Sequence, residues 1–139
     1  MLRLRTNPSW KKALAARTPD GYYGLVTPSG WDELVHGLHD QIEIRFPDYQ
    51  LFQAKEKFGK LRYHCSVDHL CRDIITAASE VSTRTCQVCG ASGTLSEKPG
   101  PTRVLCRKDD DDLHCTNGYD LRGYTRRRPV RLLLDRLGL

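Results

Sequence analysis

The chain has 139 residues, a formal net charge of +5, and hydrophobic residues at 39% of its positions. This length and composition suit one domain with a buried core. No apolar run approaches the roughly 20 residues that cross a bilayer, which argues against a membrane protein. Residues 1–10 lack the apolar centre of a signal peptide, and clustered cysteines suit a reducing compartment, so we expect a cytoplasmic protein.

The positive charge lies at one end of the chain. Residues 122–139 contain six arginines and one acid, whereas basic and acidic residues balance over residues 1–121. We therefore expect one α+β domain over 1–121 and an Arg-rich tail over 122–139. Pro129 can begin a helix in the tail, which either docks on the core or binds a partner. The candidate partner contacts in the tail are Arg126, Arg127 and Arg128.

The first expected element is a short helix. Asn7 can cap it, Pro8 suits its first position, and Trp10 and Leu14 then fall on one face. The turn at residues 18–21 ends it. Residues 22–26 are too short to classify, and they form either an edge strand or a packed loop.

A stronger helix is expected from Ser29 to just before Pro47. The Ser29 hydroxyl can cap it, and Asp32 follows three residues later. His36 and His39 lie off the apolar stripe of this helix, so we expect both to be solvated imidazoles. The stripe consists of Trp31, Leu34, Val35, Leu38 and Ile42.

The period changes from 3.6 to 2 after residue 49. Residues 60–67 alternate between apolar and polar side chains, which predicts a strand buried on one face. Residues 49–57 pair with it through a Phe58-Gly59 turn, in which Gly59 supplies a positive φ. A third helix follows, capped by Ser66 or Asp68. Its expected buried face consists of Leu70, Ile74, Ala77, Ala78 and Val81.

Cations and aromatic rings surround the hairpin turn, and this combination can bind phosphates and bases or anchor a protein interface. The alternative is that the rings belong to the core and the cations only protect a strand edge from aggregation. The candidate partner contacts here are Lys55, Lys57, Phe58, Lys60, Arg62 and Tyr63.

The spacing of the later cysteines is typical of a zinc ribbon over about residues 84–118. Cys86 and Cys89 are separated by two residues and followed by Gly90, and Cys106 comes after a spacer of 16 residues. Buried thiols without a metal, or a redox pair, are the alternatives. The fourth zinc ligand stays open. The candidates are Cys115, His114 and Asp109.

A second group of possible ligands consists of His64, Cys65, His69 and Cys71. On an alternating strand His64 and Cys65 point to opposite faces, and Cys71 can pack as a small apolar residue. We therefore expect core packing here, not a second metal site.

Three stretches together resemble a family of small bacterial and prophage-type zinc-ribbon proteins. Residues 55–63 match a Lys-Glu-Lys-Phe-Gly-x-Leu-Arg-aromatic signature, Gly30-Trp31 matches an upstream helix start, and residues 82–90 match a Ser-x-x-Thr-Cys-x-x-Cys-Gly element. The resemblance covers about residues 30–106. It implies the fold parts and a zinc ribbon without an activity. The family usually closes the ribbon with Cys-x-x-Cys or Cys-x-x-His, and Asp109 departs from that pattern.

Enzymatic alternatives fit the sequence less well. A zinc deaminase needs a catalytic glutamate in a His-x-Glu or Cys-x-Glu element before its cysteine pair, and none is present. A nuclease of the HNH or endonuclease VII type needs its base histidine between the cysteine pairs, whereas His69 precedes the first pair. A thiol oxidoreductase needs thiols that the zinc interpretation occupies.

The sequence therefore predicts a non-enzymatic α+β protein with a structural Zn²⁺ ribbon. We expect it to bind a macromolecular partner, either protein or nucleic acid, as a prophage-type regulator or inhibitor of nucleic-acid or defence machinery. A metal-dependent nuclease of the HNH or endonuclease VII type is the alternative.

Overall fold

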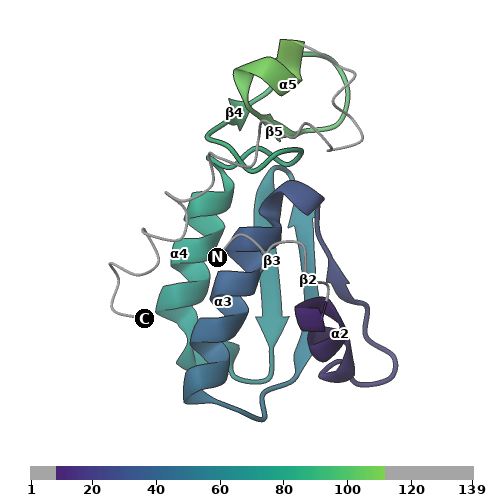
Figure 1. The fold of residues 1–139 in the computed structure, drawn as a ribbon, viewed down its shortest axis with the longest axis vertical. Helices are drawn as coiled ribbons and strands as arrows, with labels where there is room; N and C mark the ends of the chain where they lie inside the picture. The colour runs from purple at the N-terminus through teal and green to yellow at the C-terminus, as the bar shows by residue number, and fades with distance from the viewer. Residues whose placement is uncertain (1–8, 112–139) are drawn as a thin grey trace.

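The computed structural model describes residues 9–111, without the side chains of Asp109 and Asp111. It has mixed α+β architecture (Figure 1). No helix in this range is both long and apolar enough to cross a membrane. The helices are α2 (Ser9–Ala16), α3 (Asp32–Arg45), α4 (Arg72–Ser82) and α5 (Arg107–Asp111), and 3-10 turns cover Ser29–Trp31 and Asp68–Leu70. The strands are β1 (Gly24–Val26), β2 (Leu51–Lys57), β3 (Lys60–Cys65), β4 (Thr94–Leu95) and β5 (Val104–Leu105).

The main sheet has the strand order β1-β2-β3, with β1 parallel to β2 and β3 antiparallel to it. The expected hairpin is confirmed, and Gly59 has the predicted positive φ of 82°. Phe58 also has a positive φ, 53°, so both central turn residues are left-handed, as a type I′ turn requires. The sequence leaves residues 22–26 open between an edge strand and a packed loop, and residues 24–26 form the edge strand β1.

One face of this sheet forms the core. Leu61, Tyr63 and Cys65 alternate inward along β3, and Leu51 and Ala54 do so from β2. Helices α3 and α4 lie side by side over this face (Figure 1). The buried residues of α2, α3 and α4 belong to the same cluster as these strand residues, so the helices share one side of the sheet.

An irregularity in β2 keeps the core in register. Leu51 pairs with Cys65 and Gln53 pairs with His64, which leaves Phe52 as an extra residue. Without this extra residue, period-2 alternation would expose either Leu51 or Ala54, and both are fully buried.

Two details of the helix starts differ from expectation. Ser29 lies inside a 3-10 turn and does not cap α3, and neither Ser66 nor Asp68 caps α4. Leu70, predicted to be buried, is 55% exposed because it belongs to the 3-10 turn before α4 and is not in phase with that helix. Local capping signals were outweighed by the tertiary contacts at these ends.

The small sheet β4–β5 and helix α5 lie at one end of the main sheet (Figure 1). The Gly30 N–H donates to the Gln87 carbonyl at 2.9 Å, and the Trp31 indole N–H donates to the Thr85 carbonyl at 2.9 Å. A Cβ on Gly30 would stand 2.3 Å from the Cys86 carbonyl oxygen, so glycine is required there. The start of α3 and the cysteine segment are therefore packed backbone to backbone.

Candidate metal centre and open sheet face

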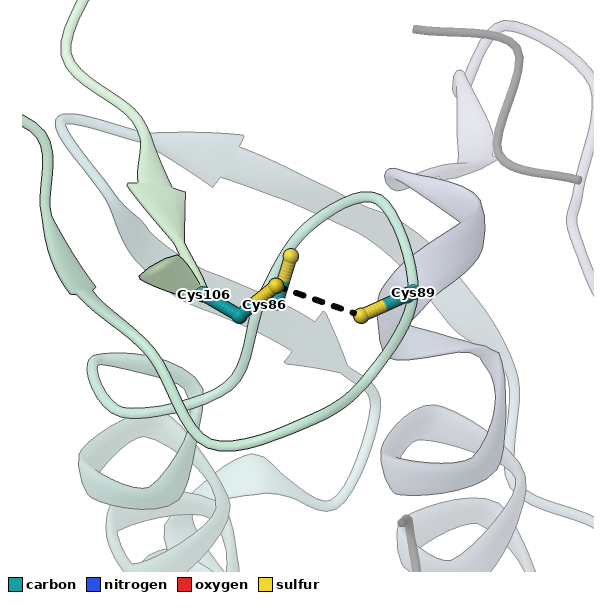
Figure 2. Close-up of side chains that lie close together, drawn as sticks. All are labelled: Cys86, Cys89 and Cys106. Atoms are coloured by element: carbon teal, nitrogen blue, oxygen red, sulfur yellow. Dashed lines mark hydrogen bonds between the residues drawn. The ribbon is translucent and has the colours of Figure 1, made fainter. Parts of the chain in front are cut away.

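Three cysteines from two distant segments meet at the end of the molecule. The sulfur atoms of Cys86, Cys89 and Cys106 all lie within 4.8 Å of one another, and those of Cys89 and Cys106 are 3.7 Å apart (Figure 2). Cys86 and Cys106 are buried, and Cys89 is half-buried. None of the three is in a disulfide. This group can hold a metal ion.

A tight backbone turn presents the first two sulfurs. The Gly90 N–H donates to the Cys86 carbonyl at 3.0 Å, and Gly90 has a φ of 84°, which a residue with a side chain rarely adopts. The Val88 N–H points at the Cys86 sulfur, 3.4 Å away. Backbone dipoles that point at sulfur stabilise a thiolate, the form that binds a metal.

Hydrogen bonds to β5 bring the third cysteine to this turn. The Gln87 N–H donates to the Val104 carbonyl, and the Gln87 side-chain oxygen accepts from the Val104 N–H at 2.7 Å. Cys106 follows two residues later, immediately before α5. The buried polar side chain of Gln87 thus fixes the position of Cys106.

The fourth ligand position is not assigned by the described residues. Asp109 lies in α5, but its side chain is outside the described part of the structure, as are His114 and Cys115. The neighbouring Asp110 is engaged elsewhere, because its Oδ1 accepts a hydrogen bond from the Ser96 hydroxyl and its carbonyl accepts one from Lys98.

The second cysteine group packs in the core, as expected. Cys65 and Cys71 are each 2% exposed, whereas His64 faces outward near Asp68. Burial raises the pKa of the Cys65 thiol to about 11 and raises that of Cys71. Two thiols held in the protonated state are poor metal ligands.

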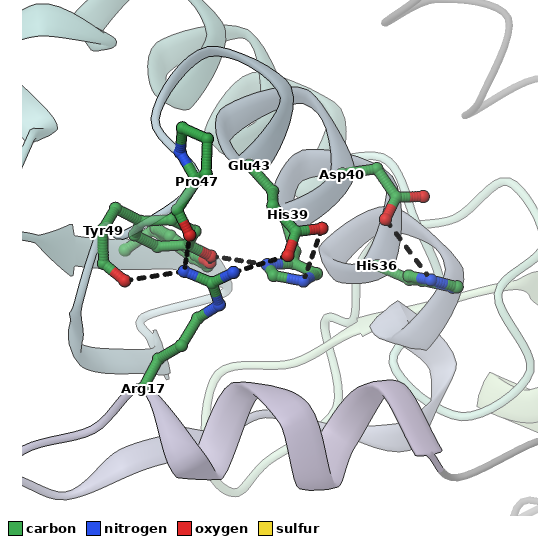
Figure 3. A network of polar contacts seen from close by, with 8 residues as sticks. Arg17, His36, His39, Asp40, Glu43, Pro47 and Tyr49 are labelled. Atoms are coloured by element: carbon green, nitrogen blue, oxygen red, sulfur yellow. Dashed lines mark hydrogen bonds and ion pairs between the residues drawn. The ribbon is translucent and has the colours of Figure 1, made fainter.

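A polar network crosses the core beside α3 (Figure 3). His39 is only 4% exposed, so the prediction of a solvated imidazole is wrong for this residue. His36 is half-buried and stacks on Trp10 with ring centres 4.8 Å apart. The flanks of the α3 stripe are covered because α2 and the tyrosines of the hairpin pack on them.

The order of hydrogen bonds in the network favours a neutral His39. The Tyr49 hydroxyl lies 2.7 Å from both His39 Nδ1 and the Tyr63 hydroxyl. Tyr63 can donate to Tyr49 and Tyr49 to Nδ1, while Nε2–H faces Glu43, 3.7 Å away. A protonated imidazole would donate from Nδ1 to the Tyr49 oxygen, and one of the two buried tyrosine hydroxyls would then have no acceptor in this chain of hydrogen bonds. Burial accordingly lowers the pKa of His39, although Glu43 and Asp40 oppose the shift.

His39, Asp40 and Glu43 are close enough to form a second possible metal group. Each already has a protein partner, however. Glu43 pairs with Arg17, whose guanidinium also donates to the carbonyls of Pro47 and Tyr49, and Asp40 faces His36 at 3.6 Å. We therefore interpret this group as structural.

The other face of the main sheet carries the hairpin cations. Leu61 and Tyr63 point inward, so the alternating positions on β3 point outward, and these are Lys60, Arg62 and His64. The register places Lys55 opposite Arg62 and Lys57 opposite Lys60. Glu56 pairs with buried Leu61 and accepts the Gly59 N–H, so it lies on the inner side. We call the outward positions of β2 and β3 the open sheet face.

Other predicted contacts lie elsewhere. Tyr63 is 3% exposed, so it belongs to the core and not to an accessible surface. Phe58 is 73% exposed at the hairpin tip, beneath the Lys57 ammonium. Arg126, Arg127 and Arg128 are outside the described residues.

Comparison of the chain with protein-family models, curated proteins and solved structures found no match in any of the three.

Proposed function

We propose that this chain is a non-enzymatic protein that binds nucleic acid through its open sheet face and is held together by a structural Zn²⁺ ion. The observation that carries the proposal is that two neighbouring cross-strand pairs on this face each place one cation opposite another. They are Lys55 opposite Arg62 and Lys57 opposite Lys60.

Such pairs are costly without a ligand. Like charges directly opposite each other on a sheet are destabilising. No ion pair within residues 9–111 involves any of these four cations. A row of phosphates supplies the missing negative charge, and the released counterions favour binding. This concentration of positive charge on one face supports a polyanionic partner.

The sulfur geometry supports zinc. Zinc binds thiolate sulfur at about 2.3 Å, so two sulfurs of a regular tetrahedral site lie about 3.8 Å apart. The Cys89 and Cys106 sulfurs, 3.7 Å apart, are close to this separation. Three cysteines that are buried or half-buried are typical of a structural zinc site. A fourth ligand from Asp109, His114 or Cys115 would complete its coordination.

Gel shifts or fluorescence anisotropy with labelled oligonucleotides, at about 50 and about 200 mM salt, test the proposal. The charge reversal Lys60→Glu should weaken binding and reduce the slope of log affinity against log salt by about 0.7–0.9 for each phosphate that the variant no longer neutralises. Lys12→Glu, at an exposed position of α2 on the helical side, is the matched control and should leave the slope unchanged. Equal slopes for the two variants would rule out the open sheet face as the binding site.

A protein partner is a second candidate, supported by the hairpin tip. Phe58 is 73% exposed and Leu95 is 54% exposed, and Leu95 lies over the turn, close to Gly59. An aromatic anchor of this kind is typical of an interface hot spot. Phe58→Ala should then abolish capture of a partner protein while leaving oligonucleotide binding intact.

The nuclease alternative receives less support from the geometry. Asp68 and His69 precede α4, and the cysteines follow it. An 11-residue helix is about 16 Å long, so it keeps these side chains apart from the sulfur cluster. Incubation of oligonucleotides with the protein and Mg²⁺ should yield no cleavage, and cleavage that is abolished in His69→Ala would overturn the non-enzymatic assignment.

A further inference from the structure

Two aromatic rings are stacked on the outer side of the main sheet. The rings of Tyr22, in the loop before β1, and Phe52, in β2, have centroids 4.6 Å apart and an interplanar angle of 25°. Tyr22 is 52% exposed and the adjacent Tyr23 is 81% exposed. The Tyr22 side chain is therefore backed by a second ring and is still about half exposed.

These rings lie on the open sheet face. Phe52 is the extra residue of the β2 irregularity, between the inward residues Leu51 and Ala54. Phe52 and Tyr22 are absent from the buried cluster and from the partly buried side chains that pack against it. The irregularity that preserves the core register therefore also turns a ring outward.

The cations continue along the same face. Gln53, next to Phe52, pairs with Gly24 on one side and His64 on the other, and the following outward row is Val26, Lys55 and Arg62. A strand rises about 3.3 Å per residue, so Lys55 lies about 10 Å along β2 from Phe52. The face thus offers a flat aromatic platform at one end and a cationic strip toward the hairpin tip.

We propose that the nucleic acid bound here is single-stranded, with a base stacked on the Tyr22–Phe52 pair and the following phosphates on Lys55 and Arg62. This inference rests on the proposed function. A duplex hides the faces of its internal bases within its own stack, whereas a single strand can place a base on an aromatic ring and its backbone on cations. A platform beside a cationic strip therefore fits the single-stranded form.

The test compares a labelled pyrimidine oligonucleotide with the duplex of the same length, in fluorescence anisotropy on the full chain. Single-strand binding should be tighter than duplex binding. Tyr22→Ala should weaken single-strand binding about 5- to 150-fold, the range expected for loss of one stacked base. Tyr22→Phe should bind the single strand as tightly as the wild type, because the ring is kept. The slope of log affinity against log salt should be unchanged in Tyr22→Ala, since all the phosphate-binding cations are still present.

Controls separate a folding defect from a binding defect. Ile44→Ala removes an apolar side chain from α3 that is more exposed than Tyr22 (77% against 52%), and it should change neither the single-strand nor the duplex affinity. Tyr22→Leu keeps apolar bulk without a flat ring and should behave like Tyr22→Ala. Equal affinity for duplex and single strand, or full binding by Tyr22→Leu, would overturn the inference. The proposed function would survive that result as long as Lys60→Glu still weakens binding, and it fails if neither form of nucleic acid binds.

Discussion

At the scale of single residues, the role of several residues depends on where they lie in the fold. Gly30 permits a backbone contact with the cysteine turn, and Gln87 fixes β5 with its side-chain oxygen. His39 is the clearest case, because the same imidazole on a solvated helix face would titrate near its usual pKa of 6.5. In the core, the cost of burial lowers its pKa, although Glu43 and Asp40 oppose the shift.

This burial predicts an acid-sensitive fold. Unfolded His39 binds a proton as the pH falls through 6.5, whereas the folded form, with its lowered pKa, resists protonation. The free energy of unfolding should therefore be highest above pH 6.5 and decrease below it. Urea denaturation at several pH values measures this.

The variant His39→Gln provides the comparison for that experiment. Glutamine can accept from Tyr49 but does not titrate, so the variant should lose part of the pH dependence, while the contribution of the metal ligands cancels between the two proteins. His36→Gln, at a half-buried position of the same helix, is the control. Identical profiles for the wild type and His39→Gln would show that His39 does not control acid stability.

At the scale of elements, the two central residues of the hairpin turn differ in how well they suit its left-handed backbone. Gly59 suits its left-handed conformation, but Phe58 has a φ of 53°, which costs an ordinary residue roughly 1–2 kcal/mol. Its ring is mostly exposed and recovers little of this through packing. Strain of this kind tends to persist at functional positions, which agrees with Phe58 as an anchor for a partner.

Replacement of Phe58 by Asn should stabilise the protein. Asn-Gly is the preferred type I′ pair, and the gain should exceed the cost of removing the cation–π interaction with Lys57, for a net increase of about 1 kcal/mol in the free energy of unfolding. Chemical denaturation measures it. Phe58→Ala keeps the strained backbone and should not be stabilised, so equal stability of the Asn and Ala variants would show that the turn is unstrained.

At the scale of the whole fold, the buried residues among positions 9–111 form two clusters. The larger one joins the three helices α2, α3 and α4 to the main sheet, and the smaller one surrounds Cys86 and Cys106. In the described residues, two short strands and a short helix support the small cluster, so we expect a bound metal to matter far more for it than for the large cluster. The two clusters should therefore respond differently to a chelator.

Metal removal should expose the three clustered thiols and leave those of Cys65 and Cys71 protected. With a strong chelator, iodoacetamide should modify Cys86, Cys89 and Cys106, and added Zn²⁺ should restore their protection. Cys65 and Cys71 should react only after denaturant is added, because they are buried and their thiol pKa values are raised. Peptide mapping by mass spectrometry reports each site. Rapid modification of Cys89 and Cys106 without a chelator would argue against a bound metal.

The sequence by itself determined the features that depend on neighbouring residues. The period-2 pattern of residues 60–67 identified β3, which ends two residues earlier, at Cys65. The Phe58-Gly59 turn identified the hairpin, and the cysteine spacing identified the three clustered thiols. Each follows from chain geometry over a few residues. The alternation also places Tyr63 among the inward residues, which conflicts with its prediction as a partner contact, and its burial decides for the core.

Only the tertiary structure decided which surfaces are covered and which distant groups meet. It buried His39, turned Phe52 outward through one extra residue in β2, stacked Tyr22 on it, and aligned cation with cation across the hairpin. A local pattern contains no information on which other segment packs against it. Burial and partnership arise from contacts between residues far apart in the chain, and these contacts set both the core and the proposed binding face.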